Sequence, residues 1–169
     1  QMCIRDSREL AAQIADNIRT YGAGIKLHSQ MVCGGVNIRP QIRHLARGTD
    51  MLVATPGRLL DLLGQGAVRL DHVKMWVLDE ADRMLDMGFI PAMRRLHAEL
   101  PKKRQTLMFS ATFSREIEAL AGEFLHQPQK IQVTPANTTV SRIDQTVYPV
   151  DKARKTELLK HLVASERWG

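Results

Sequence analysis

Short apolar runs alternate along the chain with segments whose apolar residues recur at helical spacing, and this alternation constrains the fold more than any other feature. Several of the runs are apolar at successive positions, as is typical of strands buried on both faces of a parallel sheet. The pattern therefore predicts an α/β domain built on a parallel, twisted sheet. The expected strands are residues 26–33, 51–55, 74–80, 106–112 and 130–134.

The expected helices have recognisable ends. Ser7 precedes a segment with an apolar residue at every fourth position, so its hydroxyl is expected to cap a helix that ends at Gly22 or Gly24. Residues 40–48 and 114–125 show the same helical pattern. Strand and helix thus follow one another along most of the chain.

Composition narrows the class of protein. A chain of 169 residues that is 44% hydrophobic can bury a sizeable core. No apolar run approaches the ~18 residues needed to span a bilayer, and no leader pattern opens the chain, so a cytoplasmic protein without membrane contact is expected. Cys3 and Cys33 are too few for a disulfide framework or a thiolate metal site and are expected to be reduced. The net charge of +6 favours a polyanionic partner.

Polar clusters follow four of the expected strands at the point where each strand ends. They are Gly34–Gly35, Thr55–Arg58, Asp79–Asp82 and Ser110–Thr112. Ligands of open α/β sheets bind in the crevice beyond the carboxyl ends of the strands. The sequence therefore predicts one functional rim to which all four clusters contribute.

Asp79, Glu80 and Asp82 crowd three carboxylates directly behind an apolar strand. In nucleoside triphosphatases a carboxylate at this position holds Mg²⁺, and the next group orients or deprotonates the attacking water. The alternative is that the acids only favour the N-terminal end of the following helix through its dipole, at about 0.3 to 1 kcal/mol each. These residues alone leave both interpretations open.

Taken together, the motifs resemble those of the DEAD-box RNA helicases, in that family's order and approximate spacing. They are SRELA at 7–11, GG at 34–35, TPGR at 55–58, DEAD at 79–82 and SAT at 110–112. The resemblance covers nearly the whole chain, and the surrounding sequence is most similar to bacterial RhlE-like members. It implies an enzyme with two RecA-like domains that uses ATP and Mg²⁺ to remodel RNA, bound as a single strand or short duplex.

The resemblance also implies roles for individual residues around the acidic cluster. Asp79 would hold Mg²⁺ through water, Glu80 would activate the hydrolytic water, and Asp82 would bond to the neighbouring SAT loop. That loop would couple hydrolysis to closure of the two domains. The alternative for its hydroxyls is a simple turn that caps the helix near Ser114. The coupling residues are Ser110, Ala111 and Thr112.

A track for the sugar-phosphate backbone of RNA is implied by the remaining motifs. Glycines let backbone N–H groups approach phosphates, and a helix that starts after Thr55 offers free N–H groups and a positive dipole end. Simpler explanations exist, since the paired glycines could form only a turn and the arginine of TPGR could be solvated. The expected RNA-binding residues are Arg8, Gly34, Gly35, Thr55, Pro56, Gly57 and Arg58.

An arginine stripe lies apart from these motifs. Three arginines recur every four residues on a predicted helix whose apolar residues face the core, which places the stripe beside the proposed track. A solvated helix face is the preferred interpretation. The arginines are Arg39, Arg43 and Arg47, and the apolar residues are Ile38, Ile42 and Leu45.

The chain contains no Gly-x-x-x-x-Gly-Lys-Ser/Thr phosphate loop, so it is expected to be a fragment that is inactive as an ATPase on its own. Residues 1–6 depart from the family pattern of an apolar strand and Pro-Thr. They are set apart as an atypical N-terminus that could be foreign, which leaves the first strand in question. Residues 7–134 are expected to form part of helicase domain 1, the polar stretch 135–141 a linker, and 142–169 the first strand (143–150) and helix (152–164) of domain 2.

Two other functions remain open on the sequence. One is a catalytically silent RecA-like module that binds RNA, and the other is a P-loop translocase directed to DNA. The preference for RNA comes from the resemblance alone, because contacts to the phosphate backbone carry no sequence information and only contacts to the 2′-OH separate the two polymers.

Overall fold

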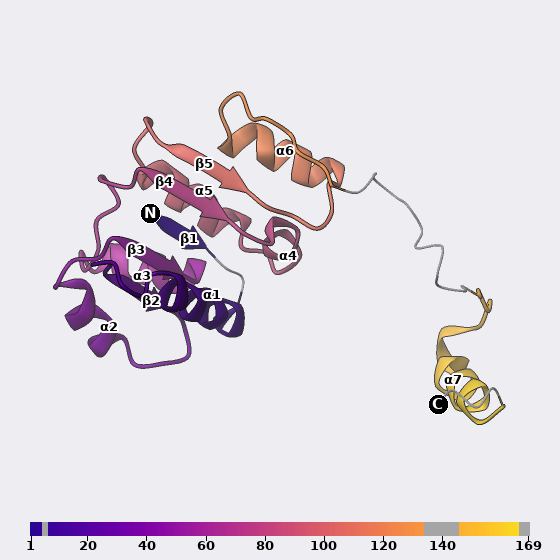
Figure 1. Cartoon of the computed structure of the whole chain (residues 1–169). Coiled ribbons are helices and arrows are strands. Elements are labelled where there is room, and N and C mark those ends of the chain that lie inside the picture. Colours follow the sequence, from indigo (N-terminus) through magenta and orange to yellow (C-terminus); the bar gives the residue numbers. More distant parts are fainter. Residues whose placement is uncertain (5–6, 134–145, 166–169) are drawn as a thin grey trace. The chain divides into compact units, whose positions relative to one another are not determined.

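The computed structural model describes residues 1–4, 7–133 and 146–165. The chain divides into two compact units, Gln1–Ile131 and Gln132–Gly169 (Figure 1). In the second unit the described elements are a short 3₁₀ turn, η1 (Lys152–Arg154), and the helix α7 (Lys155–Ser165). Within the described residues, no helix combines the length and the apolar character required to cross a bilayer.

The first unit is built on a parallel sheet of five strands in the order β2-β3-β1-β4-β5. The last residues of the strands, Val32, Ala54, Ile4, Leu78 and Met108, pair with one another in a single row. Whatever follows each strand therefore emerges at the same edge of the sheet. The strands are β1 (Met2–Ile4), β2 (Ser29–Val32), β3 (Met51–Ala54), β4 (Met75–Leu78) and β5 (Gln105–Met108).

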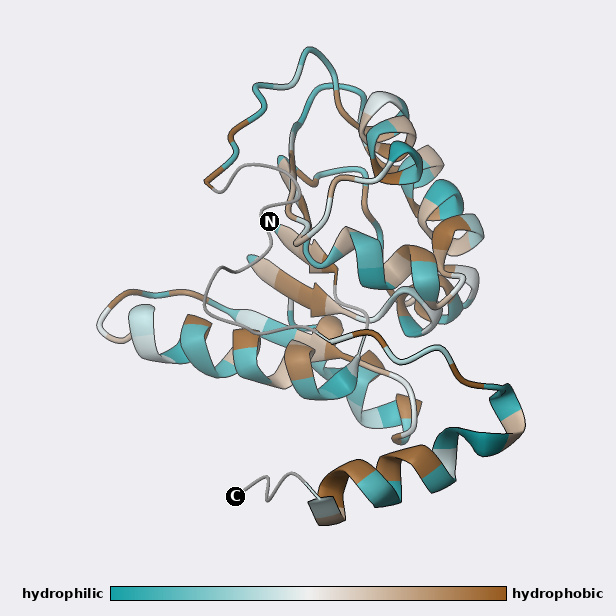
Figure 2. Cartoon of the chain, turned by 90° about the vertical axis from the view of Figure 1, so that its right-hand side faces the viewer, coloured by the Kyte–Doolittle hydropathy of each residue, from teal (hydrophilic) through white to brown (hydrophobic). Residues whose placement is uncertain are grey.

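Six helices accompany this sheet, and they cover its two faces unequally. Side chains alternate between the faces of a strand, so Met31 and Val53 lie on the side of α1 while Leu52 and Ala54 point into the main core, which α3 and α5 cover. Figure 2 shows apolar strands in brown and helices that alternate between brown and teal, as amphipathic helices do. The helices are α1 (Arg8–Tyr21), α2 (Ile38–Leu45), α3 (Pro56–Gly64), α4 (Ala81–Asp86), α5 (Ile90–Glu99) and α6 (Arg115–Phe124).

An aromatic cluster fills the core near the amino ends of β4 and β5. The Trp76 side chain is fully buried, and its ring centroid lies 5.5 Å from those of both His97 and Phe124. The guanidinium of Arg104 lies 5.2 Å from the centroid of the Trp76 ring, and its Nη2 is 2.9 Å from Nδ1 of His97. This cluster ties α5, α6 and the segment before β5 to the sheet, at the opposite edge from the row of strand ends.

The structure confirms the predicted parallel α/β sheet and most of its strands, but the strand expected at 130–134 is wrong. Residues 130–133 form no strand, and Ile131 and Val133 are 75% and 97% exposed. Lys130 instead bonds to Glu118 of α6 and lies over the ring of Phe113. An apolar run without a neighbouring strand to pair with remains outside the sheet. Residue 134 lies outside the described part of the chain.

The central position in the sheet belongs to Met2–Ile4, within the segment whose strand was in question. Met2 and Ile4 are 1% and 0% exposed, and β1 pairs with β3 on one side and β4 on the other. Backbone pairing is independent of side-chain identity, and two alternate apolar side chains suffice to join the core. The atypical residues therefore do supply a first strand, while residues 5–6 lie outside the described part.

In the second unit the predicted helix is present, whereas the described residues of the predicted strand form no strand. The helix predicted at 152–164 is present as η1 followed by α7. Of the strand predicted at 143–150, residues 146–150 are described and form no strand. A lone strand has no backbone partners, so an extended segment here gains nothing from strand geometry. The proposed linker at 135–141 lies outside the described residues, and the domain limits remain predictions.

Candidate functional site

The row of strand ends brings the four predicted clusters to one rim. Backbone hydrogen bonds connect neighbouring loops there: the N–H of Asp79 donates to the carbonyl of Ile4 at 3.3 Å, and the N–H of Phe109 donates to that of Leu78 at 2.8 Å. The rim is thus continuous with the sheet that supports it, and side chains placed on it inherit the rigidity of the strands.

At the end of β4, Glu80 adopts a left-handed backbone conformation with φ 55° and ψ 53°. A non-glycine residue in this region carries strain of about 1–3 kcal/mol, and such strain persists where the surrounding structure imposes it. The turn lets the chain pass directly from β4 into α4, with Oδ1 of Asp79 accepting a hydrogen bond from the N–H of Glu80 at 3.0 Å. The Glu80 carboxylate is 31% exposed, with Oε2 3.4 Å from Nε of Arg83. The two acids predicted to serve the nucleotide are therefore neighbours on a fixed turn.

Asp82 connects the acidic loop to the SAT loop of the neighbouring strand. Its Oδ2 accepts hydrogen bonds from both the N–H and the hydroxyl of Thr112, each at 3.1 Å, and its Oδ1 accepts one from the N–H of Arg83 at 3.1 Å. Burial raises the pKa of Asp82, but the hydrogen bonds from Thr112 and Arg83 outweigh it and hold that pKa below its usual range. The carboxylate is therefore an ionised acceptor that joins two loops.

The alternative for the SAT hydroxyls was a turn that caps the helix near Ser114, and the structure shows a turn at Ser110 but no cap from Ser110 or Thr112. The hydroxyl of Ser114 itself caps α6 by accepting the N–H of Ile117 at 3.4 Å. The hydroxyl of Ser110 donates to the carbonyl of Thr112 at 2.7 Å, which closes the loop on itself. Ala111 is exposed between these two residues. The loop is thus shaped by its own bonds and by Asp82.

A surface hollow of about 450 Å³ lies over the loops that follow β2 and β3. It collects residues from α1, from the loop after β2, from the start of α3 and from the turn before α5. Five of the seven predicted RNA-binding residues line it, while Gly35 and Pro56 do not. The lining consists of Arg8, Gly34, Thr55, Gly57, Arg58, Asp61 and Phe89.

Asp61 and Phe89 were missed by the sequence analysis. Asp61 lies three residues after Arg58 on α3, so helical spacing could have placed both on one face. Phe89 follows the turn that ends α4, and no spacing rule connects it to the hollow. An aromatic ring in such a wall offers a surface on which a nucleic-acid base can stack.

Unpaired backbone N–H groups stand at this wall. Within the described residues, the N–H groups of Gly57 and Arg58 make no hydrogen bond, as expected for the first turn of a helix. The same holds for the N–H group of Gly35 in the turn after β2. Together with the positive end of α3, these donors suit an anion such as a phosphate.

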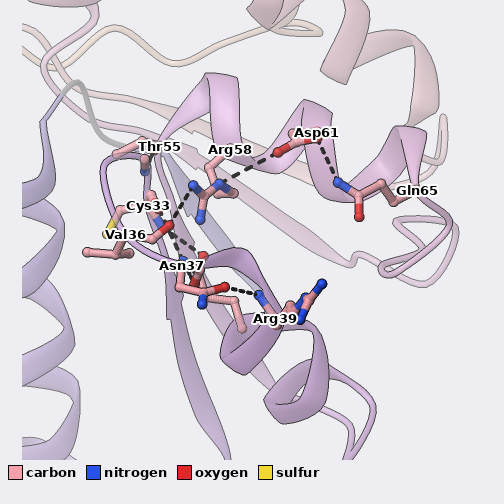
Figure 3. A network of polar contacts seen from close by, with 10 residues as sticks. Cys33, Val36, Asn37, Arg39, Thr55, Arg58, Asp61 and Gln65 are labelled. Atoms are coloured by element: carbon pink, nitrogen blue, oxygen red, sulfur yellow. Dashed lines mark hydrogen bonds and ion pairs between the residues drawn. The ribbon is translucent and has the colours of Figure 1, made fainter.

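Arg58 is not the solvated side chain that the simpler alternative assumed. Its side chain is only 11% exposed, and Nη2 donates to the carbonyl of Val36 at 2.9 Å (Figure 3). Nε lies 3.8 Å from Oδ2 of Asp61. Arg58 therefore joins α3 to the glycine loop while its charge remains at the hollow.

The predicted arginine stripe has the solvated character that was preferred for it, but only Arg39 and Arg43 lie on α2, which ends at Leu45, and Arg47 follows in the turn after it. All three arginines are exposed, and none lines the hollow. Of the apolar residues predicted on the opposite face, Leu45 is buried and Ile38 and Ile42 pack against the core. The residues of the stripe are Arg39, Arg43 and Arg47.

The carboxylates at the rim can bind Mg²⁺ only together with the phosphates of a nucleotide. Across residues 1–4, 7–133 and 146–165, no three His, Cys, Asp or Glu side chains come together as a metal cage. Mg²⁺ is commonly bound through one or two carboxylates plus substrate phosphates and water, which the Asp79–Glu80 pair can supply. The oxygens of Asp82, in contrast, accept hydrogen bonds from Thr112 and Arg83.

A parallel sheet with an acidic turn at one strand end, joined to a hydroxyl loop at the next, is typical of α/β proteins that bind ligands beyond the carboxyl ends of their strands. The model of the DEAD/DEAH box helicase family matches residues 2–120, and the chain belongs to this family. The match includes β1, so it extends into the atypical N-terminal residues.

Relatives in this family align with almost the whole chain. An ATP-dependent RNA helicase RhlB from Pseudomonas aeruginosa is 43% identical, with 99% of this chain and 43% of the relative covered. An ATP-dependent RNA helicase DBP2 from Vanderwaltozyma polyspora is 42% identical, with 98% of this chain and 38% of the relative covered. The chain thus spans about two fifths of the length of these relatives. The finer assignment to RhlE-like members remains a prediction.

A solved structure supports the fold. The crystal structure of a hypothetical ATP-dependent RNA helicase from Sulfolobus tokodaii matches with a TM-score of 0.72 and 35% identity, covering 76% of this chain and 38% of that one. The predicted RecA-like fold is confirmed.

Proposed function

We propose that the chain is part of an ATP-dependent RNA helicase that binds the RNA backbone and couples ATP hydrolysis to local separation of RNA duplexes. The observation that carries this proposal is the row of strand ends, which brings to one edge of the sheet an acidic pair suited to a metal-bound triphosphate and a hollow lined by arginines and unpaired backbone N–H groups. RNA and ATP are both available in the cytoplasm, where we place the protein.

For the nucleotide, Asp79 would hold Mg²⁺ through water and Glu80 would orient or deprotonate the attacking water. The metal, when bound, neutralises charge that develops on the transferring phosphoryl group. The chain's own contribution is positioning: the left-handed turn at Glu80 fixes both carboxylates at the end of a central strand. Positioning and electrostatic stabilisation supply most of phosphoryl-transfer catalysis.

For RNA, the hollow offers donors to a phosphate rather than to a base edge. The N–H groups of Gly57 and Arg58 and the positive end of α3 favour an anion, and the exposed Arg8 adds a positive charge from α1. Such contacts position a strand without reading its sequence. The helicase would therefore act on single strands or short duplexes of any sequence.

Coupling between the two activities would pass through Asp82. Its hydrogen bonds to Thr112 connect the turn that bears Glu80 to the loop after β5. A change in nucleotide state that moves one loop must then move the other, because the two share one carboxylate.

The proposal is tested by titrating the 169-residue chain with a labelled single-stranded uridine oligonucleotide over a range of salt concentrations. We expect weak binding whose affinity falls steeply with salt, because each neutralised phosphate releases counterions. The matched deoxyribonucleotide measures the contribution of the 2′-OH. No binding, or binding insensitive to salt, would contradict the proposed RNA track. In the complete protein, Glu80→Gln should abolish both ATP turnover and duplex separation.

A further inference from the structure

Among the described residues, Gln41 is the only polar or charged residue that is buried, with 9% of its surface exposed. It lies on α2, between the apolar side chains of Ile38 and Leu45 that face the core. A buried amide is costly unless its hydrogen bonds are satisfied, and those bonds show what it holds in place.

The amide of Gln41 binds both ends of the loop after β2. Its Oε1 accepts the N–H of Cys33 at 3.2 Å, while its Nε2 donates to the carbonyl of Cys33 and to the carbonyl of Asn37, each at 3.3 Å. Both backbone groups of Cys33 are therefore turned inward. The five residues 33–37 are closed into a loop around one side chain.

The middle residues of this loop, Gly34–Val36, make no hydrogen bond to Gln41 and are exposed. The N–H of Gly34 donates to the hydroxyl of Thr55 at 3.3 Å, and the carbonyl of Val36 accepts from Arg58. Gly35 has φ +74°, a conformation that favours glycine. With these groups fixed, the N–H group of Gly35 remains without a partner in the described chain.

We propose that Gln41 is a positioning residue for RNA: its buried amide holds the Gly34–Val36 turn at the hollow so that the unpaired N–H group of Gly35 meets a phosphate. This inference rests on the proposed RNA track. Gln41 itself touches no RNA; it acts through the loop. Only an amide supplies the acceptor and the two donors that Cys33 and Asn37 require, whereas a carboxylate lacks the donors and an apolar side chain lacks all three.

The alternative is that Gln41 only stabilises α2 and the sheet edge. A double-mutant cycle with Gly34→Ala separates the two roles. An added Cβ at Gly34 meets no protein atom within 4 Å, so the change leaves the fold intact and only obstructs a ligand that approaches the loop. If Gln41 affects RNA affinity by positioning the loop that RNA approaches, the losses of binding free energy caused by the two substitutions should not add in the double variant.

The experiment titrates the full 169-residue chain and its variants with the labelled uridine oligonucleotide, at a temperature where circular dichroism shows each variant folded. We expect Gln41→Met and Gly34→Ala each to weaken binding by about tenfold, the size expected for losing one hydrogen bond to a charged group. The double variant should bind no more weakly than the weaker single variant. Multiplied losses, or undiminished binding by Gln41→Met, would overturn the proposal.

Two further variants keep the outcome decisive. Gln41→Glu retains an acceptor for Cys33 and replaces Gln41→Met in the cycle if the apolar variant does not fold. Leu45→Ala opens a cavity in the same helix without touching the loop, so it should lower stability and leave RNA affinity unchanged. Loss of affinity in Leu45→Ala would mean that general destabilisation explains the Gln41 variants. If the unmodified chain does not bind RNA, or if Gly34→Ala does not weaken binding, the proposed RNA track itself is wrong. If only Gln41→Met departs from its predicted effect on binding, this inference alone is wrong.

Discussion

At the scale of single residues, the glycines of the rim serve two different purposes. Gly35 has φ +74°, so its backbone favours glycine. Gly57 has no such need: it lies in the first turn of α3, and a Cβ there would meet no atom within 4 Å. A glycine that the fold does not require, at the wall of the hollow, leaves room for a phosphate of the proposed RNA track to approach the backbone.

Gly57→Ala should therefore stabilise the chain while weakening RNA binding. Replacing glycine by alanine within a helix stabilises it by about 0.5–1 kcal/mol, whereas the added methyl group projects toward an approaching phosphate. Urea unfolding and RNA titration on the same preparation measure both effects. Gly64→Ala, at the other end of α3 and away from the hollow, is the matched control and should leave affinity unchanged. Equal RNA affinity in the two variants would remove Gly57 from the track.

His97 makes the stability of the first unit sensitive to acid. Because a guanidinium has no acceptor, Nδ1 of His97 must accept from Nη2 of Arg104, which requires a neutral ring. Burial and then the charge of Arg104 hold the pKa of His97 below its ordinary value of 6.5, although Glu123 opposes this. The unfolded chain thus binds the proton more readily, and the free energy of unfolding should fall as the pH drops below 6.5.

Urea unfolding at a series of pH values from neutral to mildly acid measures this dependence. His97→Gln keeps an acceptor for Arg104 but cannot titrate, so its stability should fall less over the same interval. Parallel curves for the two proteins would show that the acid sensitivity arises elsewhere, for example from Asp82, whose lowered pKa acts at lower pH.

At the scale of elements, the sequence predicted which loops meet but not everything that surrounds them. Strand and helix alternation placed the clusters after β2, β3, β4 and β5 at one edge, because all parallel strands end on the same side. The run at 130–134 failed because local pattern cannot show whether a strand has a neighbour. Met2–Ile4 was doubted because residues 1–6 depart from the family pattern, yet the strand needs only two alternate apolar side chains to join the core.

In the candidate site, too, the sequence predicted some residues and missed others. Motif residues such as Gly34 and Arg58 were identified because their order along the chain matched a family. Phe89 and Gln41 were not, because their positions depend on the turn between α4 and α5 and on the packing of α2 against the loop after β2. Such contacts join residues through tertiary structure and leave no periodic signal in the sequence.

The difference between the hollow and the arginine face of α2 gives an element-scale prediction. Arg8→Ala removes a charge that lines the hollow, so it should flatten the dependence of log affinity on log salt by about one unit. Arg39→Ala removes the same charge from a solvated face and should leave the slope unchanged. RNA titrations across salt concentrations compare the two. A flatter slope for Arg39→Ala would extend the track over α2 and contradict the solvated interpretation.

At the scale of the whole molecule, the chain covers 43% of the RhlB relative, and the proposed coupling would be a property of the complete protein. Within this chain, the bonds between Asp82 and Thr112 join two loops of the first unit. In the proposed function, the Asp82–Thr112 bonds transmit the response to ATP from one loop to the other and do not produce that response themselves.

In the complete protein, changing Ser110 and Thr112 together to Ala should impair duplex separation more than ATP turnover. Hydrogen bonds to a charged group contribute about 1.5–3 kcal/mol each, enough to bias a closed state a few kcal/mol from the open one. The backbone N–H of Thr112 can still donate to Asp82, so the fold at the rim should persist. Parallel ATPase and unwinding assays decide, with Glu80→Gln as the variant that loses both. Equal losses in the double variant would assign the loop to the chemistry instead.

The aromatic cluster at the opposite edge of the sheet gives the protein an optical reporter of its own. Trp76 is fully buried with its ring 5.5 Å from that of His97, and the chain has only one other tryptophan, Trp168. With Trp168 replaced by Phe, fluorescence would arise from the first unit alone. Because a protonated imidazole quenches a neighbouring indole, the emission of Trp76 in the folded chain would follow the charge of His97. Its spectrum would shift to longer wavelength only when the core opens to water.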